Sequence, residues 1–358
     1  MLIKKPVGIV AYGAALPSWA VSLKLIGEAQ RANGEAVARS LMVEQKTVPN
    51  LDEDAITLAT AAGAQALARA KRSKPVVAKV EEQTQALFVG SESHPYAVKP
   101  SGTVVAQALG LSTNLAMVDL QFACKAGTQG LQICASYVLS GMAKLGIVIG
   151  ADTAQAEPGD ALEYTAAAGA AAFLIGSKNL LAKLLATTSV ATDTPDFWRR
   201  AGQDYPKHGG RFTGEPAYFT HIAQAAKFLL SETKLKPSDF NHCIFHTPNG
   251  KFPRKVAKRL GFSQQQLETS LIVEKIGNTY AGAVPLALAA VLDHAKAKQK
   301  IFVVSYGSGA GADAFVFETA AELEAQRPSW QALIAEQITN LELLDLANYL
   351  RLRDGRSH

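Results

Sequence analysis

The feature that most constrains the fold is an internal repeat, in which two stretches of the chain follow the same plan of strands and helices. Cys124 stands 23 residues before an apolar run that begins at Ile147, and Asn278 stands 23 residues before a similar run at Ile301. Duplication of alternating strands and helices predicts an α/β fold built from two pseudo-symmetric halves that pack together.

The repeat extends upstream of both positions. Glu92 precedes Cys124 by 32 residues, and His246 precedes Asn278 by the same number. His246 directly follows its expected strand, whereas Glu92 stands three residues beyond Val89, so the two correspond in place rather than residue for residue. Chemistry in open α/β sheets gathers beyond the carboxyl ends of the strands. We therefore expect these four side chains to converge on one site.

The halves are expected over residues 1–180 and 181–319, followed by a helical tail over residues 320–358. Alternation of strands and helices predicts mainly parallel sheets in both halves. Pro285 falls inside the helix expected after Asn278, so this helix is expected to be kinked or to begin later.

Composition excludes several classes of protein. Apolar residues make up 48% of the chain and charged residues 19%, which fits a globular enzyme and not a disordered chain. The net charge of +5 is spread along the chain without a basic stripe, which favours a small anionic ligand over nucleic acid. The apolar run Val7–Leu16 is too short to cross a bilayer and contains glycines, so it predicts a buried strand and no membrane segment.

The three cysteines form neither a metal-like CxxC pair nor an even disulfide set, which predicts a reducing cytoplasm and no metal site. One of them, Cys124, lies where a buried strand runs into a helix. A thiol at the first turn of a helix faces unpaired N–H groups and the positive end of the helix dipole, which favour a thiolate nucleophile. A buried cysteine is more often a small hydrophobic residue. The expected partners of Cys124 favour the nucleophile.

Each partner also has a plain structural alternative. Glu92 is either an exposed loop carboxylate or a base whose pKa is raised by partial desolvation. His246 ends a strand, where it is either structural or accessible to a ligand. Asn278 is a helix cap, a ligand donor, or both. The Gly-rich stretch Ser305–Gly311 lacks the lysine of a P-loop and the Rossmann spacing, and its N–H groups are candidates for part of an oxyanion hole.

A set of cations follows His246 around one expected helix. Such a set is often a solvated helix face, but its place next to His246 favours contact with the phosphates of an anionic cofactor tail. The set comprises Lys251, Arg254, Lys255, Lys258 and Arg259.

With Glu92, Cys124, His246 and Asn278 in this order, the chain resembles the thiolase-fold condensing enzymes, most closely the hydroxymethylglutaryl-CoA synthases of archaeal type. The resemblance covers about residues 6–318. The segments that carry it are Gly90–Pro100, Phe122–Gly127, Ile149–Thr153, Pro158–Thr165, Thr192–Arg200, His208–Pro216 and Pro248–Phe252.

The resemblance implies a thiolase fold with an α/β/α/β/α layer order and an acyltransferase of the mevalonate (isoprenoid) pathway. The implied reaction joins acetyl-CoA to acetoacetyl-CoA without a metal or redox cofactor. Cys124 would be the acetylated nucleophile, Glu92 the general acid and base, and His246 the residue that positions and polarises the second thioester. The positions that match CoA or acyl contacts are Thr165, Arg211, Thr213, Lys251, Lys255, Asn278 and Ser308.

The resemblance also implies a homodimer, and a complex with an acetoacetyl-CoA thiolase bridged by a small zinc-ribbon and OB-fold protein. The tail after Arg327 departs from the family ending. Two other functions remain open: an initiating ketoacyl-carrier-protein synthase, which normally lacks the Glu92 equivalent, and a non-catalytic scaffold subunit of a thiolase-like acyltransferase complex.

Overall fold

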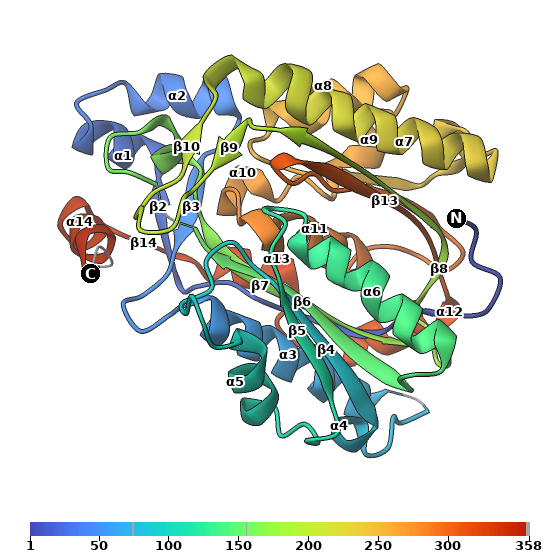
Figure 1. Ribbon diagram of the computed structural model, residues 1–358. Helices are drawn as coiled ribbons and strands as arrows, with labels where there is room; N and C mark the ends of the chain where they lie inside the picture. The colour runs from blue at the N-terminus through green and yellow to red at the C-terminus, as the bar shows by residue number, and fades with distance from the viewer. Residues whose placement is uncertain (74, 155, 356–358) are drawn as a thin grey trace.

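A computed structural model describes residues 1–73, 75–154 and 156–355, except for the side chain of Arg211. The chain is built around a nine-stranded sheet with the order β11-β12-β13-β8-β1-β7-β6-β4-β5 (Figure 1). In this order the strands are His242–Phe245, Lys300–Val304, Gly309–Thr319, Ala182–Thr194, Gly8–Ala15, Ala168–Gly176, Leu145–Thr153, Thr84–Gly90 and Ala116–Leu120.

The sheet is mixed. The pairs β11–β12, β4–β5 and β4–β6 are parallel, whereas the other neighbours are antiparallel. The α/β class is confirmed, but antiparallel pairs are more frequent than the sequence predicted. In two of the antiparallel pairs, β6–β7 and β12–β13, one strand follows the other without an intervening α-helix, and short connections join antiparallel strands. The other antiparallel pairs, β1–β7, β1–β8 and β13–β8, join strands that are distant in the chain.

The two halves of this sheet meet at a narrow junction between β1 and β8. Only Gly8↔Lys183 and Ile9↔Ala182 are paired there. A Cβ atom on Gly8 would lie 2.1 Å from the carbonyl oxygen of Ala182, so the junction needs glycine at this position. On either side of the junction, β1 continues along β7 and β8 continues along β13. The boundaries at residues 180 and 319 stay predictions.

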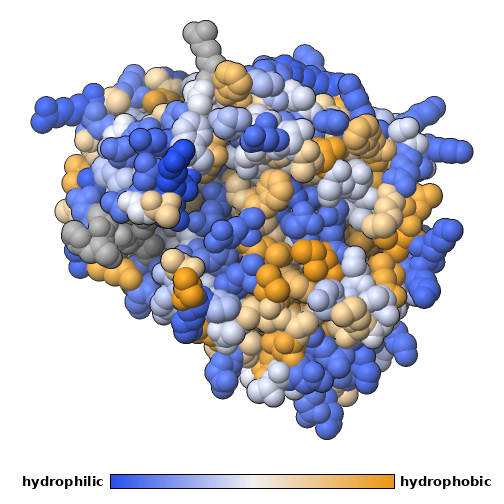
Figure 2. Space-filling view, in the orientation of Figure 1, coloured by the Kyte–Doolittle hydropathy of each residue, from blue (hydrophilic) through white to orange (hydrophobic). Residues whose placement is uncertain are grey.

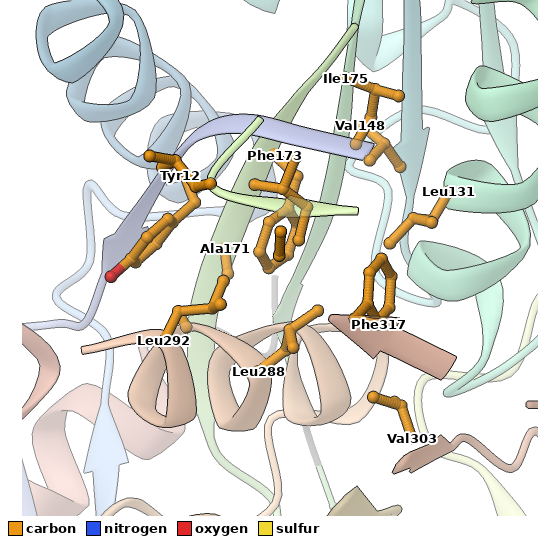
Figure 3. Close-up of a cluster of buried hydrophobic side chains, with 14 of the residues drawn as sticks. Tyr12, Leu131, Val148, Ala171, Phe173, Ile175, Leu288, Leu292, Val303 and Phe317 are labelled. Atoms are coloured by element: carbon orange, nitrogen blue, oxygen red, sulfur yellow. The ribbon is translucent and has the colours of Figure 1, made fainter. Parts of the chain in front are cut away.

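Alternating side chains divide the molecule into layers. Val303 and Phe317 point into a middle core with α6 (Ala126–Ser140) and α11 (Ala283–Leu292), whereas Phe302 and Val316 point into an outer core. Figure 3 shows the middle core, in which Phe173 and Leu131 of the first half lie near Leu288 and Phe317 of the second. The outer core of the second half includes α7 (Phe219–Thr233) and α8 (Lys251–Leu260).

The outer core of the first half includes α3 (Ala55–Arg72) and side chains of α5 (Ser101–Ala108). The order is therefore helices, sheet, helices, sheet, helices, as the resemblance implied. Helix α11 begins at Ala283, so Pro285 lies in its first turn, where its missing N–H costs no helical hydrogen bond. This later start is one of the two outcomes expected from the sequence.

The described part of the tail contains helices and one short strand. It contains α12 (Ala321–Gln326), α13 (Ile334–Thr339), β14 (Glu342–Leu343) and α14 (Leu346–Asp354). Strand β14 joins a small sheet in which β2 (Trp19–Ser22) lies between β14 and β3 (Gln45–Val48). The end of the tail therefore packs on the first half (Figure 1).

Shorter elements complete the part of the chain that the structure describes, and in it no helix is both long and apolar enough to cross a membrane. They are α1 (Leu23–Ala29), α2 (Gly34–Leu41), α4 (Val80–Gln83), η1 (Ala161–Tyr164), β9 (Phe197–Trp198), β10 (Lys207–His208), η2 (Gly210–Thr213), η3 (Gly214–Tyr218), η4 (Pro237–Asp239), α9 (Gln264–Glu268), α10 (Val273–Ile276), η5 (Tyr280–Gly282) and η6 (Arg327–Ser329).

Candidate functional site

Cys124 lies in the sharp turn between β5 and α6. Ala123 has a left-handed φ of 43°, an unfavourable conformation for a residue other than glycine, and Cys124 follows it. The thiol is 5% exposed, and its Sγ donates a hydrogen bond of 2.9 Å to Oε1 of Glu92. The structure thus brings two of the predicted site residues into direct contact.

The protonation state of Cys124 differs from the prediction. Burial, and then the negative charge of Glu92, raise the pKa of the thiol well above its usual value. Helix α6 begins only at Ala126, and the desolvation of the sulfur outweighs the helix dipole. The resting group is therefore a thiol and not the predicted thiolate.

The surroundings of Glu92 correspond to the second of its two alternatives, a carboxyl whose pKa is raised. Burial and the charge of Asp152 raise the pKa of its carboxyl to about 8, although the hydrogen bond from Cys124 opposes the shift. A carboxyl with a pKa near neutrality exchanges protons readily at physiological pH. The contact between Cys124 and Glu92 is therefore a pair of groups between which one proton can move.

The turn that carries Glu92 is held by the buried carboxylate of Asp152 at the end of β6. Oδ1 of Asp152 accepts hydrogen bonds from the Glu92 N–H at 2.8 Å, from the N–H of Ser93 at 3.0 Å, and from the hydroxyls of Ser91 and Ser93 at 2.6 Å. Its Oδ2 accepts the N–H of Ala281 at 2.7 Å. One side chain thus ties the Glu92 turn to a segment of the second half.

A second wall of the site surrounds the sulfur. Ala166 and Tyr280 form a small buried cluster with Cys124. Asn278 donates its N–H to the carbonyl of Thr165 at 2.8 Å, and its Oδ1 accepts the N–H of Tyr280 at 3.0 Å. Two predicted ligand positions, Thr165 and Asn278, are therefore joined to each other next to Cys124. Asn278 does not cap α11, which begins at Ala283.

His246 is buried at the end of β11. Its ring centroid lies 6.3 Å from those of Tyr218 and Tyr306, and burial lowers its pKa to about 3, so the imidazole is neutral. Its Nδ1 has no hydrogen-bond partner among the described residues. The hydroxyl of Tyr306 donates to Asp196 at 2.6 Å.

Three N–H groups of the Gly-rich stretch after β12 are not available as the oxyanion donors suggested by the sequence. Gly307 and Gly311 pair with each other through both N–H groups, and the N–H of Gly309 donates to Asp196 at 2.8 Å. These three donors are used inside the protein, so the prediction was wrong for them.

Lys125, the residue after Cys124, is anchored in the second half. Its Nζ lies 2.9 Å from Oδ1 of Asp313 on β13, and both side chains are buried. Thr128 and Ser189 also donate hydroxyl hydrogen bonds to Asp313, at 2.9 and 2.7 Å. Such a fully hydrogen-bonded pair tolerates burial, because the charges keep polar partners.

A cleft of about 650 Å³ opens over this site. Its walls include Glu92, Ala123 and Tyr280, together with Phe197 and Arg199. Among the described residues, its lining does not include Cys124, His246, Asn278, Thr165 or the cations of α8. The cleft therefore reaches the reactive pair from the side of Glu92.

The predicted CoA contacts lie on separate elements. Lys251 and Lys255 are exposed on α8, and Nζ of Lys255 lies 4.8 Å from the ring centroid of Phe219. Arg254 and Arg259 form ion pairs with Glu274 and Glu215. Two cations of the predicted set are therefore neutralised within the protein.

Three further positions were predicted to contact CoA or the acyl group, namely Thr213, Ser308 and Arg211. Thr213 donates its hydroxyl to the carbonyl of Gly210 at 2.9 Å, and Ser308 is half-buried. The side chain of Arg211 lies outside the described part. Within residues 1–73, 75–154 and 156–355, no group of His, Cys, Asp and Glu side chains is arranged to hold a metal ion.

Comparison with known proteins gives the family. The hydroxymethylglutaryl-CoA synthase of Methanopyrus kandleri is 48% identical over 353 residues, covering 99% of both chains. That of Methanobrevibacter smithii is 49% identical over 350 residues, covering 97% of this chain and 98% of the relative. The chain belongs to the hydroxymethylglutaryl-CoA synthase family.

Solved structures agree with this family. An MvaS in complex with 3-hydroxy-3-methylglutaryl coenzyme A is 26% identical, with a TM-score of 0.85 over 98% of this chain and 92% of the other. A synthase complexed with CoA has a TM-score of 0.86 at 22% identity, over 97% of this chain and 90% of the other. Residues 230–319 match the family described as 3-oxoacyl-[acyl-carrier-protein] synthase III C terminal. The thiolase-like fold of hydroxymethylglutaryl-CoA synthases is therefore confirmed.

The sequence did not single out the two aspartates that organise this site. Asp152 and Asp196 lie within segments that carry the family resemblance, Ile149–Thr153 and Thr192–Arg200, but no role was inferred for either. The only available signal was a carboxylate directly after or beside an apolar strand. Such a group, when buried, must collect hydrogen bonds from elsewhere.

The pair of Cys124 and Glu92 leads to a prediction about alkylation. Glu92→Gln removes the charge that helps to raise the thiol pKa, so the rise of the Cys124 alkylation rate with pH should shift to lower pH. Intact-mass analysis of iodoacetamide-treated protein measures this rate, with Glu157→Gln, an exposed carboxylate, as the control. An unchanged or upward-shifted profile would contradict the electrostatic coupling. Cys134 and Cys243 are fully buried, and should react slowly in all three proteins.

Proposed function

We propose that this chain joins acetyl-CoA to acetoacetyl-CoA, releasing CoA and hydroxymethylglutaryl-CoA for the mevalonate pathway. The observation that carries the proposal is the 2.9 Å hydrogen bond between Cys124 and Glu92, in a chain 48% identical to a named synthase over nearly its whole length. The pair combines a nucleophile with an adjacent base, which is the requirement for covalent catalysis.

In the first step Cys124 attacks the thioester carbon of acetyl-CoA. The thiol starts protonated, so Glu92 accepts its proton as the C–S bond forms. The proton then passes to the departing CoA sulfur, and the enzyme is left with an acetyl-cysteine and an ionised Glu92. Because its pKa is raised to about 8, Glu92 is a stronger base than an ordinary carboxylate, which favours its acceptance of the thiol proton.

In the second step Glu92 removes a proton from the acetyl methyl group. The resulting carbanion attacks the ketone carbon of acetoacetyl-CoA, and the new alkoxide takes the proton that Glu92 had removed. Neutral His246 supports this step as a hydrogen-bond donor to the second thioester, because burial keeps it uncharged. Water then cleaves the thioester to Cys124, which releases the product and restores the thiol.

Two other functions were open from the sequence. A ketoacyl-carrier-protein synthase has the match to residues 230–319 in its favour, but it forms its carbanion by loss of CO₂ and has no use for Glu92 beside the sulfur. A non-catalytic scaffold has no need of a protonated thiol paired with a carboxyl of raised pKa.

Binding of the CoA tail is assigned to exposed cations and nearby polar groups. Lys251 and Lys255 form no ion pair with any described residue, unlike Arg254 and Arg259, and phosphate binding suits such exposed ammonium groups. Thr165, Thr213, Asn278 and Ser308 complete the proposed acyl and CoA contacts, together with Arg211. The reaction as proposed uses the CoA thioesters as substrates and requires no metal or redox cofactor.

A homodimer is proposed through strand β5. This strand ends the nine-stranded sheet, so one of its backbone edges has no neighbour among the described strands. Val118 on it is 50% exposed, and the strand has neither lysine nor proline, the usual protection of an edge. Figure 2 shows apolar side chains in the lower centre of this face, over the end of the sheet at which β5 lies. Pairing of β5 with the same strand of a second copy would cover both edges.

The complex with an acetoacetyl-CoA thiolase and a small zinc-ribbon and OB-fold protein stays a prediction from the resemblance, as does the cytoplasmic location. A pull-down of the tagged chain from its own cell extract, with identification of a thiolase at stoichiometric amount, would test the complex.

Glu92→Gln is the variant that separates the three functions. It keeps the size of the side chain and removes the base, so carbon–carbon bond formation should fall by about two to four orders of magnitude, while some acetylation of Cys124 persists. Product mass measures condensation, and intact mass measures the acetyl-enzyme, with Cys124→Ser as the control that takes no acetyl group. Condensation at nearly wild-type rate would contradict the role of Glu92. A preference of the wild type for malonyl-carrier protein would instead favour the ketoacyl synthase.

Lys251→Ala should raise the KM for acetyl-CoA severalfold and leave kcat nearly unchanged, because contacts to phosphates are shared by the ground and transition states. Steady-state kinetics at several salt concentrations measures the effect, which should weaken as salt rises. Lys227→Ala, an exposed lysine on α7, is the matched control. A collapsed kcat with an unchanged KM would mean that Lys251 acts in the chemistry.

Val118→Lys should convert the dimer to a monomer, because a charged side chain would then lie within the proposed pairing of β5 strands. Light scattering after gel filtration gives the mass of each variant. Phe228→Lys, a matched change at an exposed apolar residue of α7, should leave the dimer intact. A dimeric Val118→Lys protein would place the interface elsewhere, and a monomeric wild type would contradict the dimer itself.

A further inference from the structure

A buried carboxylate near the site takes no part in the proposed reaction. Glu163 on η1 is 2% exposed, and its Oε1 accepts hydrogen bonds from the hydroxyl of Tyr349 at 2.7 Å and from Nη1 of Arg353 at 3.2 Å. Its Oε2 accepts from Nε2 of Gln30 and from the N–H of Gly159, both at 2.7 Å. Every lone-pair direction of this carboxylate therefore has a donor near it.

Two of these donors come from the C-terminal helix α14. Tyr349 and Leu352 of this helix are each 2% exposed and belong to the core that includes Val21 and Tyr164. Figure 1 shows α14 beside β14, at the edge of the first half. Gly355, which follows the helix, lines the cleft over the site. The tail is thus a fixed part of the structure around the cleft.

The chain runs directly from Glu163 to the wall behind the sulfur. Thr165 and Ala167 form backbone hydrogen bonds with Asn278, at 2.8 and 2.9 Å. Ala166 between them packs against Cys124. A displacement of Glu163 would therefore be passed over three residues to the surface that faces an acyl group on the sulfur.

Packing between this segment and the helix is incomplete. A cavity of about 60 Å³ lies beside Glu163, and its lining includes Tyr349, Leu352 and Arg353 of the helix and the three alanines Ala154, Ala156 and Ala166. The same alanines contact the cluster of Cys124. Where atoms leave a void, the lost contacts must be replaced by directional interactions if the geometry is to stay fixed. The hydrogen bonds of Glu163 supply them.

We propose that Glu163 is a positioning residue, through which Tyr349 and Arg353 of the C-terminal helix fix the wall formed by Thr165 and Ala166 against Cys124. The wall sets the orientation of the acetyl group during transfer, since small errors in the placement of reacting atoms cost large factors in rate. The inference rests on the proposed function and extends it to the C-terminal tail.

Tyr349→Phe tests the inference, because it removes one donor to Glu163 and keeps the buried ring. We expect the single-turnover rate of Cys124 acetylation at saturating acetyl-CoA to fall about tenfold, with KM changed less than twofold. Alkylation of Cys124 by iodoacetamide, which needs no such orientation, should change less than twofold. Arg351→Met, an exposed cation of the same helix, is the matched control and should behave as wild type.

A second pair of variants covers the case in which Tyr349→Phe folds poorly. Arg353→Met should slow acetylation, and Arg353→Lys, which keeps a cation near Glu163, should restore part of the rate. Circular dichroism at the assay temperature gives the folded fraction. Acetylation at the wild-type rate in Tyr349→Phe and Arg353→Met, or a loss only in proportion to unfolded protein, would overturn the positioning role alone. A wild type that takes no acetyl group from acetyl-CoA would overturn the proposed function and this inference together.

Discussion

The site depends on one buried carboxylate, that of Asp152. Removing a carboxylate from water costs several kcal/mol unless hydrogen bonds replace the lost solvation. Asp152 obtains them from the turn that carries Glu92 and from Ala281 in the second half. Because a charged acceptor binds N–H groups strongly, the two halves are fixed to each other at the point where Glu92 meets Cys124. Gly150, two residues earlier on β6, permits this approach, since a Cβ there would lie 2.3 Å from the carbonyl oxygen of Ala281.

The buried pair of Lys125 and Asp313 acts on the other side of the sulfur. It ties the residue after Cys124 to β13. In the same way, Asp152 ties the turn that carries Glu92 to η5. Both anchors cross between the halves, so neither half holds the reactive pair by itself. The burial that raises the pKa of both Cys124 and Glu92 is a product of the same packing. The geometry and the proton affinity of the site therefore have a common origin.

The sequence predicted the parts of this arrangement that are encoded locally. The repeat spacing indicated the α/β halves, and the positions of Cys124 and Glu92 after strands indicated their meeting. The fate of the Gly-rich N–H groups and the state of the thiol were mispredicted, because both depend on burial and on partners far away in the chain. The role of Asp152 could not be predicted for the same reason, since the groups that donate hydrogen bonds to it lie about 60 and 129 residues away in sequence. The predicted strand directions were wrong for pairs such as β6–β7 and β12–β13, in which one strand follows the other without an α-helix between them.

The place of β1 in the sheet has a consequence for the synthesis of the protein. This strand is among the first segments to leave the ribosome, yet its two neighbours, β7 and β8, begin only at Ala168 and Ala182. Until they emerge, the apolar residues of β1 have no strand beside them, and pairing with β7 closes a loop across α3, β4, β5 and α6. Closure of so long a loop is slow compared with the formation of local helices. The newly made chain therefore carries an exposed, aggregation-prone strand for about half of its translation, because β7 ends at Gly176 of 358 residues, and its yield in the cell depends on protection of that strand.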